Sequence, residues 1–244
     1  MTIFQKSYEL PPFDMGEIYR YSGIKQLHVY EQKSVSRDEL VRETRKVMLE
    51  LSRQMRETVC ECTDMCRDFI GRVCFCEVPV KIDGQTVDLT FAKTRSADLC
   101  KNLRNCGSAV IFAATVGVEI DRLISKYGLI SPSKAVILGA IGAERIEAAC
   151  NAFCDDIKGQ KAKEGKFTRP RFSPGYGDLP LEFQKDIFSL LDCFRKIGLS
   201  LSESLLMSPS KSVTAIVGIS DSPCRDTSGC LYCENSDCNF RKEP

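Results

Sequence analysis

The sequence predicts an α+β fold in which a twisted, mostly antiparallel sheet is flanked by helices. Apolar residues recur every three or four positions over residues 36–66, and residues 133–157 are nearly all apolar with one polar stripe, which indicates two long helices. Runs rich in β-branched residues, such as "VCFCEVPVKIDGQTVDLTF" and "SVTAIVGIS", stand apart from these helices. They do not alternate with helices in the regular way of a parallel sheet, so α+β is favoured.

The first long helix is expected over residues 36–66, with Ser36 as its candidate N-cap and acidic residues in its first turn. Cys62 and Cys66 continue its apolar face. Because a free cysteine is among the most frequently buried residues, we expect these two thiols to pack in a core.

A hairpin is predicted around Asp83-Gly84, since this pair between two β-rich runs is typical of a tight turn. Cys74 and Cys76 alternate in its first run and should share one sheet face. A short helix is then expected over residues 97–103, and a buried strand over residues 108–117 with another helix after it.

The second long helix, over residues 133–157, is nearly all apolar but carries one polar stripe with spacings of three and four. The stripe consists of Glu144, Glu147, Asn151 and Asp155. Cys150 and Cys154 are expected on the side that faces the core, with Ile146 and Ile157.

The C-terminal half is predicted to hold one more helix and two strands. The helix should begin near Pro180, with Asp178 or Leu179 at its cap, and end before Gly198. The strands are expected over residues 199–207 and 212–220, joined by the turn "SPSK".

Charge and hydropathy exclude two classes of partner. The 34 basic and 33 acidic residues give a net charge of +1, so no electrostatic footprint for nucleic acid is expected. The longest apolar run, residues 135–143, is shorter than the roughly 20 residues that a membrane span needs. The N-terminus lacks the pattern of a signal peptide, so a cytoplasmic location is expected.

The residue types narrow the chemistry further. The chain has one histidine, His28, in a setting without a partner motif, and it has no glycine-rich phosphate loop. Hydrolytic and nucleotide-driven reactions are therefore disfavoured. The segment "RFSPGYGDLP", residues 171–180, is either a plain connection or a ligand cradle with Arg171 and Tyr176 as its polar groups, because glycine permits close approach and proline stiffens the chain.

Ordered motifs over about residues 109–218 resemble the reactivation domain of cobalamin-dependent methionine synthase. The matching positions are Arg171, Pro174, Gly175, Tyr176, Pro180, Lys185, Ser202, Glu203, Ser204, Met207, Pro209, Ser212 and Val213. The sequence thus divides into an N-terminal region (1–95), an activation-domain-like region (96–220) and a cysteine-rich tail (221–244), with residues 1–220 expected to form one globular unit.

The resemblance implies that S-adenosylmethionine binds along this loop, with Arg171 on the methionyl carboxylate. The implied binding residues are Arg171, Phe172, Ser173, Pro174, Gly175, Tyr176 and Gly177, with Glu144 or Glu147 for the amino group. No catalytic side chain is implied, since the protein would act by holding the sulfonium methyl in line with cobalt.

The implied function is that of a stand-alone reactivation factor, the activation component of a cobalamin-dependent methyltransferase. It would support reductive methylation of the cob(II)alamin form of a separate corrinoid protein, most readily methionine synthase. The partner would present the cobalamin, and a flavodoxin or ferredoxin would supply the electron. A non-catalytic docking module for a corrinoid protein is the alternative.

The tail departs from the usual form of this domain and resembles the ending of stand-alone, anaerobe-type versions. Cys224, Cys230, Cys233 and Cys238 lie within fifteen residues, and four thiolates suit Zn or an iron–sulfur cluster. Neither a standard zinc nor a ferredoxin spacing is met, so a reduced, partly disordered tail is the competing interpretation. A cluster would favour a third function, a metal-centred electron carrier for another corrinoid methyltransferase system.

Overall fold

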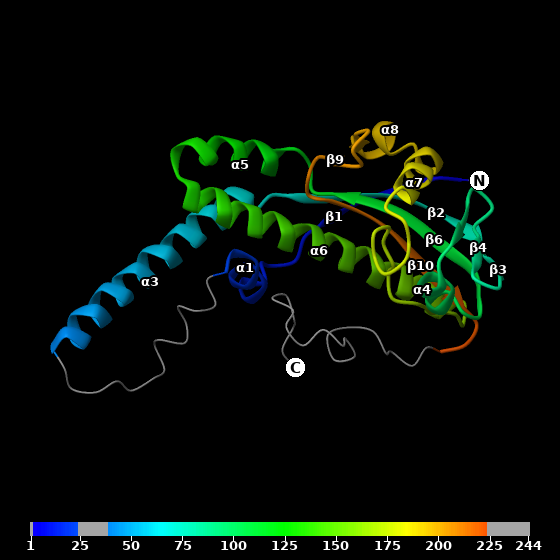
Figure 1. Cartoon of the computed structure of the whole chain (residues 1–244), viewed down its shortest axis with the longest axis horizontal. Coiled ribbons are helices and arrows are strands. Elements are labelled where there is room, and N and C mark those ends of the chain that lie inside the picture. Colours follow the sequence, from blue (N-terminus) through cyan, green and yellow to red (C-terminus); the bar gives the residue numbers. More distant parts are fainter. Residues whose placement is uncertain (1, 24–38, 224–244) are drawn as a thin grey trace. The chain divides into compact units, whose positions relative to one another are not determined.

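The computed structural model describes residues 2–23 and 39–223, which fall into two compact units (Figure 1). The sheet unit combines Met1–Leu10, Ile70–Val118 and the chain from Ile146 onward. The helical unit combines Pro11–Phe69 and Glu119–Arg145. Each unit contains residues from both of the predicted regions, 1–95 and 96–220. The division of the chain at residue 95 stays a prediction.

The core of the sheet unit is a five-stranded antiparallel sheet in the order β1-β2-β6-β10-β7. Its strands are β1 (Phe4–Glu9), β2 (Ile70–Pro79), β6 (Cys106–Thr115), β10 (Ser212–Ser220) and β7 (Phe167–Thr168). The predicted buried strand over 108–117 corresponds to β6, and the predicted strand over 212–220 is β10.

The second half of helix α6 (Pro132–Lys163) covers one face of this sheet. The ring centroid of Phe153 lies 5.0 Å from that of Phe75 on β2 and 4.8 Å from that of Phe112 on β6. A Cβ atom on Gly71 would lie 2.7 Å from the Ala149 methyl carbon, so β2 and α6 approach too closely for a side chain there.

The opposite face of the sheet carries the main apolar cluster of this unit. Three helices pack on it: α4 (Ala97–Asn102), α7 (Phe183–Leu191) and α8 (Cys193–Ile197). Cys74 and Cys76 are both fully buried in this cluster, which confirms that they share one face of β2.

A small three-stranded sheet follows β2 and contains the predicted hairpin. Its strands are β3 (Lys81–Asp83), β4 (Thr86–Asp88) and β5 (Lys93–Arg95). Asp83 stands opposite Thr86, and Gly84 in the turn between them has φ of 58°, a conformation that glycine adopts readily.

The helical unit contains α1 (Met15–Ser22), α3 (Glu39–Cys66), α5 (Glu119–Ile130) and the first half of α6. The Asp14 carboxylate caps α1 by accepting a hydrogen bond from the Glu17 N–H at 3.1 Å. Cys62 and Cys66 are fully buried, as predicted, whereas the candidate cap Ser36 lies outside the described residues.

Three predictions of local structure were wrong. Residues 199–207 do not form one strand, because a positive φ at Leu205 helps to fold them into the short pair β8 (Ser200–Leu201) and β9 (Met207–Ser208). The helix ending before Gly198 is interrupted by Asp192, whose φ of 48° separates α7 from α8.

The third error concerns the start of that helix. Helix α7 begins at Phe183, and neither Asp178 nor Leu179 caps it. The Asp178 carboxylate instead accepts hydrogen bonds from the start of α4, which lies about eighty residues earlier in the chain. None of the helices within the described residues is long and apolar enough to cross a membrane.

Candidate functional site

The loop between β7 and α7 is built from two consecutive turns. In the first, the Tyr176 N–H donates to the Ser173 carbonyl at 3.1 Å, with Pro174 second and Gly175 third in the turn. Gly175 has φ of 84°. Proline followed by a residue with positive φ is the chemistry of a type II turn, so the order Pro-Gly is required here.

The second turn brings the chain back across the first. The Leu179 N–H donates to the Tyr176 carbonyl at 3.1 Å, and Gly177, with φ of 53°, follows Tyr176. The Gly175 N–H then donates to the Leu179 carbonyl at 2.9 Å and closes the loop on itself. The segment, for which the sequence left a plain connection or a ligand cradle open, therefore has a backbone that is closed by its own hydrogen bonds.

The loop enters along the edge of β10. Phe172 and Ile216 exchange two backbone hydrogen bonds, each of 2.9 Å, although Phe172 lies outside any named strand. The Phe172 ring packs against the core, and its centroid lies 6.0 Å from that of Tyr176 in an edge-on arrangement. Tyr176 is 71% exposed, so its ring stands at the tip of the loop and is open to solvent.

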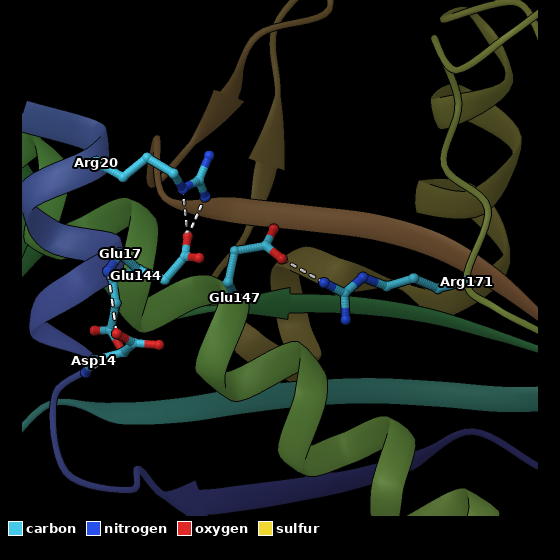
Figure 2. Close-up of polar contacts among 6 residues, drawn as sticks. All are labelled: Asp14, Glu17, Arg20, Glu144, Glu147 and Arg171. Carbon is cyan, nitrogen blue, oxygen red and sulfur yellow. Dashed lines mark hydrogen bonds and ion pairs between the residues drawn. The ribbon is translucent and has the colours of Figure 1, made fainter. Parts of the chain in front are cut away.

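Arg171 points from the loop toward helix α6 (Figure 2). Its guanidinium donates to the Asn151 side-chain carbonyl at 2.7 Å and forms a short ion pair with the Glu147 carboxylate. The Arg171 and Glu147 side chains are 25% and 43% exposed. The structure thus brings two of the predicted site residues together as a charge pair that solvent can reach.

Two cysteines on α6 lie beside this pair. Burial raises the pKa of Cys150 to about 12, while the neighbouring Arg171 acts in the opposite direction. Burial also raises the pKa of Cys154, which hydrogen-bonds to Arg171 and is only partly buried. Cys150 therefore packs in the core as predicted, whereas Cys154 lies at the border of the site.

Glu144, the other acidic candidate on α6, has a different environment within the helical unit. It is 4% exposed, and its two carboxylate oxygens accept from the Arg145 guanidinium at 2.5 and 2.6 Å. It also accepts from the Asp14 N–H at 3.2 Å. A ligand contact for Glu144 stays a prediction, but the carboxylate already holds a buried ion pair.

Arg145 is a structural residue that the sequence reasoning missed. It is 2% exposed, donates to the Pro11 carbonyl at 2.7 Å, and lies 4.0 Å from the Phe13 ring centroid. It therefore fixes the segment that leads into α1. On that helix Glu17 forms an ion pair with Arg20 (Figure 2).

The prediction that Asp178 caps the helix after the loop is wrong, because its carboxylate binds the start of α4 instead. Its carboxylate accepts from the Ala97 N–H at 2.6 Å, from the Asp98 N–H at 3.2 Å and from the Ser96 hydroxyl. The order Ser-x-Asp at residues 96–98 shows that a helix starts there, but it does not show that an aspartate from a distant loop completes the cap.

The candidate metal ligands Cys224, Cys230, Cys233 and Cys238 lie outside the described residues, as does His28. Within residues 2–23 and 39–223, no group of three or more His, Cys, Asp or Glu side chains could hold a metal ion. The Zn or iron–sulfur centre therefore stays a prediction about the tail.

Residues 106–223 match the family described as vitamin B12 dependent methionine synthase, activation domain. Among solved structures, the crystal structure of the MetH reactivation domain bound to AdoHcy is similar, with a TM-score of 0.61 and 13% sequence identity. The similarity covers 94% of this chain and 82% of that chain. No curated protein matches the sequence significantly.

These findings confirm the resemblance to the activation domain and the predicted α+β class. The family match spans β6, β10 and the loop of residues 171–179, so it includes the Arg171 pair and both turns. At 13% identity the structural similarity establishes the fold.

Proposed function

We propose that this chain binds S-adenosylmethionine through the loop of residues 171–177 and supports reductive methylation of a corrinoid held by a separate protein. The observation that carries this proposal is the ion pair between Glu147 on α6 and Arg171, which lies at the start of the ordered Pro-Gly-Tyr-Gly loop; both residues fall within the matched family region. The AdoHcy in the similar crystal structure supports it, because AdoHcy is what remains of S-adenosylmethionine after methyl transfer.

The charges of the pair suit the methionyl end of this ligand. An α-amino acid carries a carboxylate and an ammonium group close together, and Arg171 and Glu147 present the two complementary charges. The guanidinium would bind the carboxylate through charge-assisted hydrogen bonds, while Glu147 would accept from the ammonium. Glycines at 175 and 177 would let the backbone approach the adenosine, and the exposed Tyr176 ring would lie toward the sulfonium.

The reaction would consume one electron and one S-adenosylmethionine. A flavodoxin or ferredoxin reduces the partner's cobalt(II) to cobalt(I), whose electron pair then attacks the sulfonium methyl. The new bond joins carbon to cobalt, the carbon–sulfur bond breaks, and AdoHcy leaves. Because no proton moves, the protein needs no acid or base, and its contribution is to hold the methyl group in line.

The first test is calorimetric titration of S-adenosylmethionine into anaerobically purified protein. Arg171→Ala should weaken binding by about ten- to hundredfold, since a hydrogen-bonded pair to a charged group is lost. Arg195→Ala is the matched control, because this arginine is 82% exposed and its ion pair with Asp192 spans 3.9 Å. Methylthioadenosine, which lacks the amino-acid end, should bind much more weakly than S-adenosylmethionine.

Absence of binding to the unaltered chain would refute the proposal and favour the docking module. Equal affinity for methylthioadenosine would refute the role given to Arg171 and Glu147. Binding would justify a methylation assay with the cobalamin-binding part of a methionine synthase, S-adenosylmethionine and a reductant, in which methylcobalamin should form only with all components present.

A further inference from the structure

We infer that Asp178 is a positioning residue for S-adenosylmethionine, because it ties the C-terminal end of the binding loop to helix α4. This inference rests on the proposed function of the loop. Asp178 lies two residues after Tyr176 and is not assigned a contact with the ligand. It acts by holding the turns that present Arg171 and Tyr176.

Both oxygens of the Asp178 carboxylate accept hydrogen bonds at the start of α4. One oxygen accepts from the Ala97 N–H at 2.6 Å, and the other accepts from the Asp98 N–H at 3.2 Å and from the Ser96 hydroxyl. The Ser96 hydroxyl and these backbone N–H groups hold the pKa of Asp178 below its usual value. Ser96 in turn accepts from the Leu99 N–H at 2.9 Å, so loop and helix cap form one network.

The same helix holds the other end of the loop. The Asn102 side-chain amide, at the last position of α4, donates to the Pro170 carbonyl at 3.2 Å. The loop is therefore fixed at Pro170 by one end of α4 and at Asp178 by the other. The residues that would contact the ligand lie between these two attachments.

Gly177 shows how closely the loop lies on the helix. A Cβ atom at this position would collide with the Asp98 carboxylate, and φ of 53° already disfavours other residues. Two glycines and a solvent-exposed tip give this segment many alternative conformations when it is released. Loss of the Asp178 attachment should therefore lower the fraction of molecules whose loop is ready to bind.

The test compares Asp178→Ala and Asp178→Asn with the unaltered chain, and uses Asp186→Asn as the control for loss of one negative charge. Asp186 is exposed on α7 and its carboxylate makes no hydrogen bond to any residue that the structure describes. Hydrogen–deuterium exchange reports on residues 96–99 and 171–179, calorimetry gives the S-adenosylmethionine affinity, and thermal unfolding gives overall stability.

Asp178→Ala should increase exchange in both segments and weaken S-adenosylmethionine binding by about tenfold, through a lower population of the competent loop. Asp178→Asn, which keeps one acceptor oxygen, should lie between Asp178→Ala and the unaltered chain in both measurements. Asp186→Asn should leave both unchanged. A purely structural role would lower the melting temperature without changing the affinity of the folded protein.

Unchanged hydrogen–deuterium exchange in residues 171–179 of Asp178→Ala would overturn the inference, whatever the measured affinity for S-adenosylmethionine. Increased exchange with unchanged affinity would overturn it as well. If the unaltered chain binds no S-adenosylmethionine, the proposed function fails and this role fails with it, while the exchange data still decide whether Asp178 orders the loop.

Discussion

Replacing Glu144 with glutamine should destabilise the folded chain far more than the same change at Glu147, one helical turn later. Both carboxylates pair with an arginine, but their exposure differs. Glu144 and Arg145 side chains are 5% and 2% exposed, whereas Glu147 and Arg171 are 43% and 25% exposed. The comparison therefore measures how burial changes the contribution of an ion pair to the free energy of unfolding, with both carboxylates on the same helix.

The expected magnitude follows from what Glu144→Gln leaves behind. Glutamine keeps one acceptor oxygen, but the substitution removes the negative charge and one of the two carboxylate contacts of 2.5 and 2.6 Å, so the buried guanidinium loses its counter-charge. Breaking a buried ion pair in this way costs about 3–5 kcal/mol. The Pro11 carbonyl and the Phe13 ring still contact Arg145, which favours the lower part of this range. The exposed pair at Glu147 should contribute only about 0–1 kcal/mol.

Urea unfolding followed by far-ultraviolet circular dichroism measures both variants. The double variant Glu144→Leu/Arg145→Met serves as a further control, because replacing a whole buried pair with apolar residues is often close to neutral. A loss below about 1 kcal/mol for Glu144→Gln would refute the reasoning, since it would show that water reaches Arg145 in solution.

Three further predictions concern Gly177, the acid stability of the fold and the reactivity of two thiols. Gly177→Ala should lower the free energy of unfolding by about 1–3 kcal/mol, measured by urea unfolding, because φ of 53° and the α4 carboxylate both oppose a side chain. The hydrogen bond from Lys6 holds the pKa of Asp156 below its usual value, so the stabilisation from this carboxylate is complete above about pH 5 and is lost as pH falls through the folded-state pKa. In Asp156→Asn the melting temperature should therefore fall less steeply as the pH is lowered in the acid range. Alkylation mapped by mass spectrometry should modify exposed Cys60 quickly and buried Cys150, with a pKa of about 12, only upon unfolding.

The turns of the loop over residues 171–179 could be predicted from the sequence because their chemistry is local. Pro174 and Gly175 fit a turn that needs a fixed φ followed by a positive φ, and both requirements are visible in adjacent residues. The pairing of Arg171 with Glu147 is not local. The sequence placed Glu147 on a polar stripe, but it could not tell which distant cation the stripe would meet.

Asp178 shows the limit of local rules most clearly. An aspartate two residues before Pro180 fits the cap of the helix that follows, and sequence spacing alone favours that assignment. The hydrogen-bonding capacity of its carboxylate is used at Ala97 instead. Because both helix starts offer free N–H groups, only the folded chain decides between them.

Strand β1 was not predicted because its residues carry little apolar periodicity. It is an edge strand, and Gln5, Lys6 and Ser7 lie at its centre, so the usual apolar alternation is weak. Arg145 was missed for a related reason. A charged residue on a helix is expected in solvent, and its burial depends on an adjacent glutamate and on carbonyls from a distant segment.

The pairing of Arg171 with Glu147 also bears on which ligands the proposed site would prefer. Glu147 neutralises Arg171, so the guanidinium is not left as an uncompensated charge at the protein surface. A simple anion would have to compete with Glu147 for Arg171, and a simple cation would have to compete with Arg171 for Glu147. A zwitterion replaces both partners at once, which favours the amino-acid end of S-adenosylmethionine over ligands that carry only one of its charges.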